Sequence, residues 1–198
     1  MKVFGIGKIA LRILSFIFFT TAFFSCSSNR SIYNSDFPFS NNIAYSSDSS
    51  FSAAVPQGWY QIEDNECNCN NILLIREGLL ASLNLVPVAM DNVSSGRIER
   101  NFLERLAKYS KILKSHNSGS ALKIIDEEEF TVDKIPARAY KYINAKGFEQ
   151  RVLLFSIGNK YFELTGNSAT KKKDILNDLF SAQNSIIGKI RLGKTQVR

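Results

Sequence analysis

The strongest constraint on the fold is the short spacing between consecutive segments with strand-like composition. Arg151–Ile157 and Tyr161–Thr165 are predicted strands, and the residues between them include Gly158 and Asn159. Glycine and asparagine adopt positive φ with little strain, so this turn favours a two-residue β-hairpin. Parallel neighbours would need a crossover of about a dozen residues, so the sheet is predicted to be largely antiparallel. The other predicted strands are Phe51–Val55, Trp59–Ile62, Ile72–Ile75, Leu79–Val88, Leu122–Val132 and Ala137–Ile143.

Two segments have the three- and four-residue spacing of apolar residues that predicts an amphipathic helix. Ser95 and Thr170 are the predicted N-caps, and Gly188 is the predicted end of the second helix. The first apolar stripe is Ile98, Phe102, Leu106, Tyr109 and Leu113, and the second is Ile175, Leu179, Ile186 and Ile187, with Phe180 beside it. The order strands, helix, strands, helix predicts the α+β class, with an antiparallel sheet of about six to eight strands covered by the two helices.

The N-terminal segment that ends at Cys26 has the pattern of an export signal. Lys2, Lys8 and Arg12 form a basic leader, and Ile13–Phe24 is apolar except for small hydroxyl residues. This order is typical of a secretory signal peptide. The apolar run is shorter than the roughly 20 residues that span a bilayer.

The motif FFSC at the end of this segment resembles the lipobox of bacterial lipoproteins. The resemblance implies that residues 1–25 are cleaved as a signal peptide and that Cys26 is acylated through its sulfur. An attached chain contributes about 0.8 kcal/mol per buried methylene, and stable anchoring needs more than one chain. In this family, a serine directly after the cysteine permits transfer to the outer membrane, and this chain has Ser27 at that position. We therefore expect a lipoprotein of the bacterial cell envelope that is anchored in the outer membrane and faces the periplasm. The alternatives are an ordinary secretory signal with a chance cysteine, and an uncleaved membrane anchor.

Residues 26–50 form a predicted flexible tether, because they are rich in Ser and Asn and have no sustained periodicity. The globular domain is predicted over residues 51–192, and a basic tail over 193–198. Some apolar residues within the tether could dock on the domain or on a partner, or could be scattered residues of a linker: Ile32, Tyr33, Phe37, Phe39 and Tyr45.

The charge balance argues against nucleic acid as a partner. Three of the 25 Lys and Arg residues (Lys2, Lys8 and Arg12) lie in the leader, and without them the net charge falls from +7 to +4. A mildly cationic, exported domain is not typical of nucleic-acid-binding proteins.

Several motifs resemble those of PsbP/DcrB-like domains. They are Phe51–Trp59 (FSAAVPQGW), Ile135–Tyr140 (IPARAY), the hairpin that ends at Asn159–Thr165, and the closing helix. The resemblance covers about residues 51–192 and implies an α/β/α sandwich. Members of this family are mostly non-enzymatic, and include photosystem accessory proteins, envelope lipoproteins and a nuclear-import factor. Many have a glycine shortly before the Pro-Ala pair, where this chain has Lys134.

Cys67 and Cys69 lie in a polar loop with Asp64 and Glu66. A disulfide between them is the first interpretation, because an exported compartment favours oxidation, although the close spacing would strain the bridge. Free or intermolecular thiols are the second. Metal binding is the third, because zinc needs four ligands and the single histidine, His116, is distant in sequence.

Two charge runs have alternative interpretations. Asp126–Glu129 could form an acidic ion site, or could be a solvated run that prevents edge pairing. Lys171–Lys173 could bind an anionic partner, or could be an exposed surface run. His116 is predicted to be solvated.

No catalytic triad, phosphate-binding loop or cofactor motif is recognisable in the sequence. We therefore predict a non-enzymatic, membrane-anchored envelope lipoprotein that binds another protein or supports an assembly. The alternatives are a thiol-redox accessory that uses Cys67 and Cys69, and a carrier of a metal or small ligand in a pocket between sheet and helix.

Overall fold

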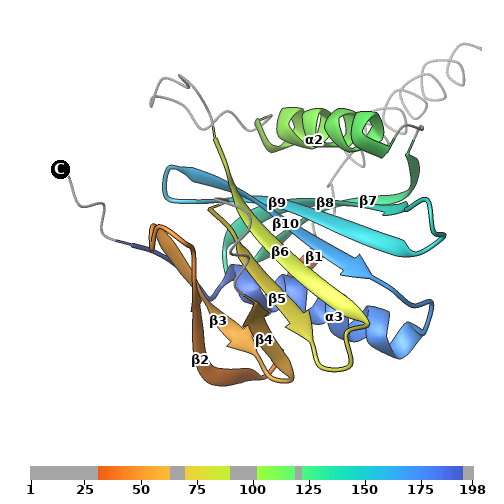
Figure 1. The fold of residues 1–198 in the computed structure, drawn as a ribbon. Helices are drawn as coiled ribbons and strands as arrows, with labels where there is room; N and C mark the ends of the chain where they lie inside the picture. The colour runs from red at the N-terminus through yellow and green to blue at the C-terminus, as the bar shows by residue number, and fades with distance from the viewer. Residues whose placement is uncertain (1–30, 63–69, 90–101, 119–121, 194–198) are drawn as a thin grey trace, which may run out of the picture. The chain divides into compact units, whose positions relative to one another are not determined.

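The computed structural model describes residues 31–62, 70–89, 102–118 and 122–193 (Figure 1). The strands before the first described helix are β1 (Ser31–Tyr33), β2 (Phe39–Tyr45), β3 (Phe51–Pro56), β4 (Trp59–Ile62), β5 (Ile72–Arg76) and β6 (Ala81–Val88). The remaining elements are α2 (Phe102–Ser118), β7 (Lys123–Val132), β8 (Ile135–Ile143), β9 (Glu149–Ile157), β10 (Lys160–Ser168), α3 (Lys173–Ile187) and β11 (Ile190–Leu192). Neither described helix is long and apolar enough to cross a membrane.

The main sheet has eight strands in the order β1-β7-β8-β9-β10-β6-β5-β4, and a second sheet has the order β11-β3-β2. The pair formed by β1 and β7 is parallel, and the other pairs are antiparallel. The predicted class, strand number and antiparallel character are therefore confirmed. The predicted hairpin at Gly158 is also present, with a φ of +60° at that residue.

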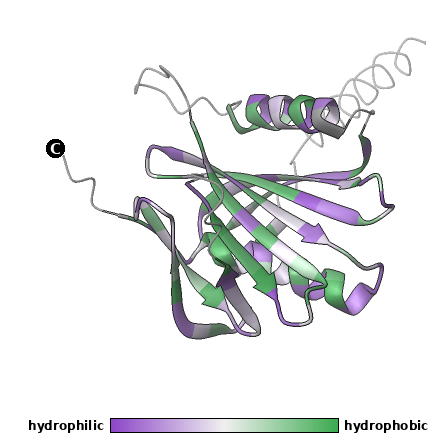
Figure 2. Ribbon diagram, viewed as in Figure 1, coloured by the Kyte–Doolittle hydropathy of each residue, from purple (hydrophilic) through white to green (hydrophobic). Residues whose placement is uncertain are grey.

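The main sheet lies between α2 on one face and α3 with the small sheet on the other (Figure 1). Successive side chains of strand β9 point to opposite faces of the main sheet. Leu153 and Phe155 pack in the core beneath α3, whereas Val152 and Leu154 pack beneath α2. Apolar and polar segments alternate along both helices, as expected for helices with one buried face (Figure 2).

Helix α3 buries the predicted stripe, with Leu179 and Ile187 fully inaccessible to solvent. Its start differs from the prediction. The N-cap is Lys172, which makes no capping side-chain bond, and the hydroxyl of Thr170 accepts a hydrogen bond from the Lys172 amide before the helix begins. Gly188 is the C-cap, as predicted.

Helix α2 is rotated relative to its predicted stripe. Leu106, Ala107 and Ser110 face the sheet, whereas Tyr109 and Leu113 are 61% and 46% exposed. The prediction of a buried Tyr109 and Leu113 is therefore wrong. Ser95 and Ile98, the predicted cap and first apolar residue, lie outside the described residues.

The tether predicted up to residue 50 is wrong from Ser31 onward, because this stretch forms two strands. β1 pairs with β7, and β2 pairs with β3. Tyr33, Phe37 and Phe39 pack against the main core. Each strand adds its backbone to a sheet edge that would otherwise leave N–H and C=O groups unpaired, which a composition-based prediction does not detect.

The turn from β7 to β8 contains Asp133 and Lys134, with φ values of +47° and +71°. Lys134 is the position at which PsbP/DcrB-like proteins often have glycine. A left-handed backbone costs a residue with a β-carbon more than it costs glycine. The turn at Lys134 therefore has a backbone conformation that favours glycine.

Candidate binding cleft

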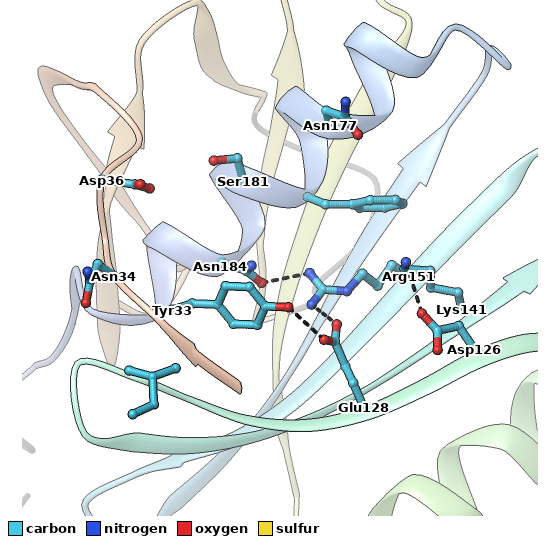
Figure 3. Close-up of a pocket in the computed structure, with 12 residues that line it drawn as sticks. Tyr33, Asn34, Asp36, Asp126, Glu128, Lys141, Arg151, Asn177, Ser181 and Asn184 are labelled. Carbon is cyan, nitrogen blue, oxygen red and sulfur yellow. Dashed lines mark hydrogen bonds and ion pairs between the residues drawn. The ribbon is translucent and has the colours of Figure 1, made fainter. Parts of the chain in front are cut away.

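A polar cleft of about 560 Å³ lies beside the sheet edge that β1 occupies, on the face covered by α3 (Figure 3). Three regions line it. They are β1 with the residues that follow it (Ile32, Tyr33, Asn34, Asp36), the strands β7 to β9 (Asp126, Glu128, Lys141, Arg151), and α3 (Asn177, Phe180, Ser181, Asn184).

Arg151 lies at the centre of the cleft and is 2% exposed. Its Nη1 donates to Asn184 Oδ1 at 2.7 Å and to Gln183 Oε1 at 3.3 Å, and its Nη2 donates to the carboxylate of Glu128. Loss of hydration lowers the pKa of the guanidinium, while the negative charge of Glu128 opposes this shift. The cation is therefore held in place by its partners rather than by water.

Two aromatic rings complete the surroundings of this cation. The guanidinium carbon lies 5.3 Å from the ring centre of Phe130 and 5.6 Å from that of Phe180. Both distances are within the range of cation–π contacts, which strengthen when water is excluded.

Tyr33 connects β1 to this ion pair. Its hydroxyl donates to Glu128 Oε2 at 3.0 Å, and its ring meets Phe130 edge-on with 5.0 Å between centroids. Burial raises the pKa of the Tyr33 phenol, and the neighbouring Glu128 carboxylate raises it further. The phenol therefore stays protonated and remains a hydrogen-bond donor at neutral pH.

Other groups of the cleft have no partner within the described residues. Nε of Arg151 is buried without a hydrogen-bond acceptor. The side chains of Asn177 and Ser181 stand on the α3 wall of the cleft (Figure 3), and neither forms a hydrogen bond with a described residue. Asn177 and Ser181 are therefore available to a bound molecule, whereas Nε of Arg151 is buried.

The acidic run Asp126–Glu129 is divided between the two faces of β7. Asp126 pairs with Lys141 at 3.2 Å in the cleft, whereas Glu127 pairs with Lys111 of α2 at 2.8 Å on the other face. Glu128 pairs with Arg151. Asp126 and Glu127 stay exposed, with side chains 51% and 47% accessible, as the interpretation of a solvated run predicts, whereas Glu128 is 23% exposed and belongs to the ion pair with Arg151. Among the described side chains, no group of three or more acidic, histidine or cysteine residues could hold a metal ion.

A second polar cluster lies beneath α2, in the other layer. The hydroxyl of Ser110 lies 2.8 Å from the Tyr140 hydroxyl and donates to Glu163 at 2.7 Å. Lys114 pairs with Glu163 at 2.8 Å. Burial raises the pKa of Tyr140. This cluster is satisfied internally, so it fastens α2 to the sheet and leaves little capacity for a ligand.

Of the residues that the sequence singled out for a site, Asp126 and Glu128 line the cleft. Cys26, Cys67 and Cys69 lie outside the described residues, so the lipid attachment and the disulfide stay predictions. Lys171–Lys173 and His116 are exposed, at the start of α3 and near the end of α2. The sequence analysis did not identify Arg151 as a site residue, and it gave Tyr33 only as an apolar residue that could dock on the domain or on a partner. The sequence did contain an indication of the buried ion pair. Arg151 is the first residue of the apolar run RVLLF, and the neighbouring predicted strand carries the four acidic residues Asp126–Glu129.

The fold is similar to that of two solved proteins. Cyanobacterial PsbP (CyanoP) from Synechocystis sp. PCC 6803 matches with a TM-score of 0.54 and 9% identity, over 77% of this chain and 92% of CyanoP. The Ran-binding protein Mog1p from Saccharomyces cerevisiae matches with a TM-score of 0.51 and 10% identity, over 78% of this chain and 96% of Mog1p. The predicted PsbP/DcrB-like fold is therefore confirmed. No protein-family model matches the chain, and no curated protein matches it.

Proposed function

We propose that the chain is a lipid-anchored protein of the bacterial cell envelope whose domain binds another protein without catalysing a reaction. The main support is the cleft. It offers amide, hydroxyl and carboxylate groups beside an arginine already engaged by Glu128 and Asn184. Such groups are suited to hydrogen bonds with a polypeptide surface.

The chemistry of the cleft favours recognition over catalysis. Ser181 has no hydrogen-bonded base among the described residues, and Tyr33 is kept protonated by burial and by Glu128. A nucleophile needs a neighbouring base or a lowered pKa. The shared fold supports the same proposal, because one protein that has it, Mog1p, is a Ran-binding protein.

The proposed anchor is the acylated Cys26, after removal of residues 1–25. We propose the outer membrane, with the domain facing the periplasm, on the basis of Ser27. The test is growth of the native host with labelled palmitate, followed by mass analysis of the N-terminal peptide. We expect label in the wild-type protein and none in Cys26→Ala, which should also leave the membrane fraction. An unmodified wild-type N-terminus would exclude the anchor.

Protein binding through the cleft is tested with a photo-crosslinking amino acid in place of Asn177. The matched control replaces Tyr60, which is 43% exposed on β4 at the opposite edge of the main sheet. We expect irradiation of intact cells to give one discrete protein adduct at Asn177 and none at Tyr60. The adduct should weaken when Glu128→Gln is added. No adduct at Asn177, or the same adducts at both positions, would contradict binding at the cleft.

A further inference from the structure

We infer that the outer face of α2 rests on the anionic surface of the bilayer to which the chain is anchored. This α2 face consists of Arg105, Lys108, Tyr109, Ile112 and Leu113. The inference rests on the proposed anchor at Cys26, and it assigns an orientation to the domain.

The first observation is the exposure of large apolar side chains on this face. Tyr109, Ile112 and Leu113 are 61%, 64% and 46% exposed. The three helix residues lie within about one helical turn, so they form one patch rather than scattered exposures. Clustered exposed apolar residues on a surface helix indicate a contact with a partner or a membrane.

The second observation is the charge of the helix. Arg105 and Lys108 are exposed basic residues of this face, whereas Lys111 and Lys114 of the same helix pair with Glu127 and Glu163 on the sheet. Glu104, which pairs with Lys108, is the one acidic residue of α2. The side chain of Lys108 is 69% exposed. An apolar strip flanked by lysine and arginine is typical of helices that lie at the interface of anionic membranes, where lipid phosphates attract the basic groups.

The third observation is where the chain enters the domain. β1 begins at Ser31, only five residues after Cys26, and five extended residues span at most about 18 Å. This reach is less than twice the diameter of a helix with its side chains, which is about 10–12 Å. An anchor at Cys26 would therefore keep the domain close to the lipid headgroups.

The register of β1 determines which end of the domain faces the membrane. Ser31 pairs with Phe130, and β1 is parallel to β7, so the chain enters from the side of the first half of β7. The end of α2 precedes that half of β7 by a few residues. The end of α2 and the start of β1 therefore both lie toward the first half of β7. The cleft lies on the face of the sheet opposite to α2.

The experiment uses the purified, acylated protein in vesicles of phosphatidylethanolamine and phosphatidylglycerol that contain a lipid with a photoactivatable headgroup. Crosslinked peptides are identified by mass spectrometry, and the mass of the N-terminal peptide reports acylation separately. We expect most crosslinks within residues 102–118. They should decrease several-fold in Ile112→Ser with Leu113→Ser, and in phosphatidylcholine vesicles.

The matched control is Ile43→Ser with Tyr45→Ser, because these residues of β2 are 55% and 54% exposed. This variant should crosslink like the wild type. If the protein is acylated but the crosslinks lie on β2 or β4, or are unchanged in the α2 variant, the inference is overturned and the anchor stands. A protein adduct at a photo-crosslinker placed at Ile112 in cells would also overturn it. An unacylated Cys26 would overturn both.

Discussion

The guanidinium of Arg151 on β9 reaches across β8 to form an ion pair with the carboxylate of Glu128 on β7. The arginine side chain is 2% exposed and the glutamate side chain 23%. In the register of β8, Lys141 lies opposite Arg151 and Ala139 lies opposite Glu128, so the ion pair crosses the intervening strand diagonally. Asp126, opposite Lys141 on β7, pairs with that lysine instead.

We expect Glu128→Ala to lower the free energy of unfolding by about 3 kcal/mol, because it leaves a buried cation without its counter-charge. Glu128→Leu combined with Arg151→Met should recover most of this loss, since replacing both members of a buried pair by apolar residues is often neutral. Urea denaturation measures both effects. Lys108→Ala, which removes an exposed pair with Glu104, is the control and should change stability little. A double variant no more stable than Glu128→Ala would contradict this account.

Gly166 on β10 is predicted to be intolerant of alanine. A β-carbon there would lie 3.2 Å from three atoms of the Gln183 side chain. Gln183 cannot move easily, because it is fully buried and its Nε2 donates to the carbonyls of Arg151 and Leu164. We expect Gly166→Ala to cost about 1–3 kcal/mol of unfolding free energy by overpacking.

Repeating the Gly166→Ala substitution in a Gln183→Ala protein tests whether crowding by the Gln183 side chain causes the loss of stability. Gln183→Ala removes the hydrogen bonds that Nε2 donates to two buried carbonyls, at a cost of about 1–3 kcal/mol, but it also removes the side chain that crowds position 166. Gly166→Ala should then cost less than in the wild type, which a double-mutant cycle in urea detects. Additive effects would mean that another contact limits position 166.

The sequence predicted what depends on local patterns. The hairpin at Gly158, the stripe of α3 and the antiparallel sheet follow from turn residues, periodicity and short connections. The role of residues 31–45 could not be predicted in this way, because a Ser- and Asn-rich segment becomes a strand only when a sheet edge accepts its hydrogen bonds. The cleft was missed for a similar reason, since Tyr33, Glu128 and Arg151 are far apart in sequence and meet only through the strand order β1-β7-β8-β9.

Helix α2 provides a direct comparison of pattern and packing. The predicted stripe included both Leu106 and Leu113, but the structure buries Leu106 (8% exposed) and leaves Leu113 46% exposed. The polar Ser110 and Lys114 turn toward the sheet instead, because Glu163 on β10 binds both. We expect Leu106→Ala to cost about 2–3 kcal/mol and Leu113→Ala less than about 0.5 kcal/mol. Thermal denaturation would contradict this if the two variants were equally destabilised.

Asp48 gives the domain a pH-dependent contact at the turn between β2 and β3. Its Oδ1 accepts hydrogen bonds from the Ser50 amide at 2.8 Å and the Ser46 hydroxyl at 2.9 Å, and its Oδ2 accepts one from Asn70 at 2.8 Å. Burial alone would raise the pKa of the carboxyl, but the bonds from Ser50 and Ser46 outweigh it, so the pKa lies below its usual 3.8.

A lowered pKa means that folding favours the ionised carboxylate. Its contribution to stability is complete above the pKa of the unfolded chain and is lost as the pH falls through the lower pKa of the folded protein. Asp48→Asn should therefore be less stable than the wild type at neutral pH, by about 0.5–1 kcal/mol because the site is exposed. The difference should shrink once the pH falls below 3.8. Urea denaturation of both proteins across this range measures it, with Asp36→Asn as the exposed control. A difference that is constant with pH would show that the turn responds to side-chain shape and not to the charge of Asp48.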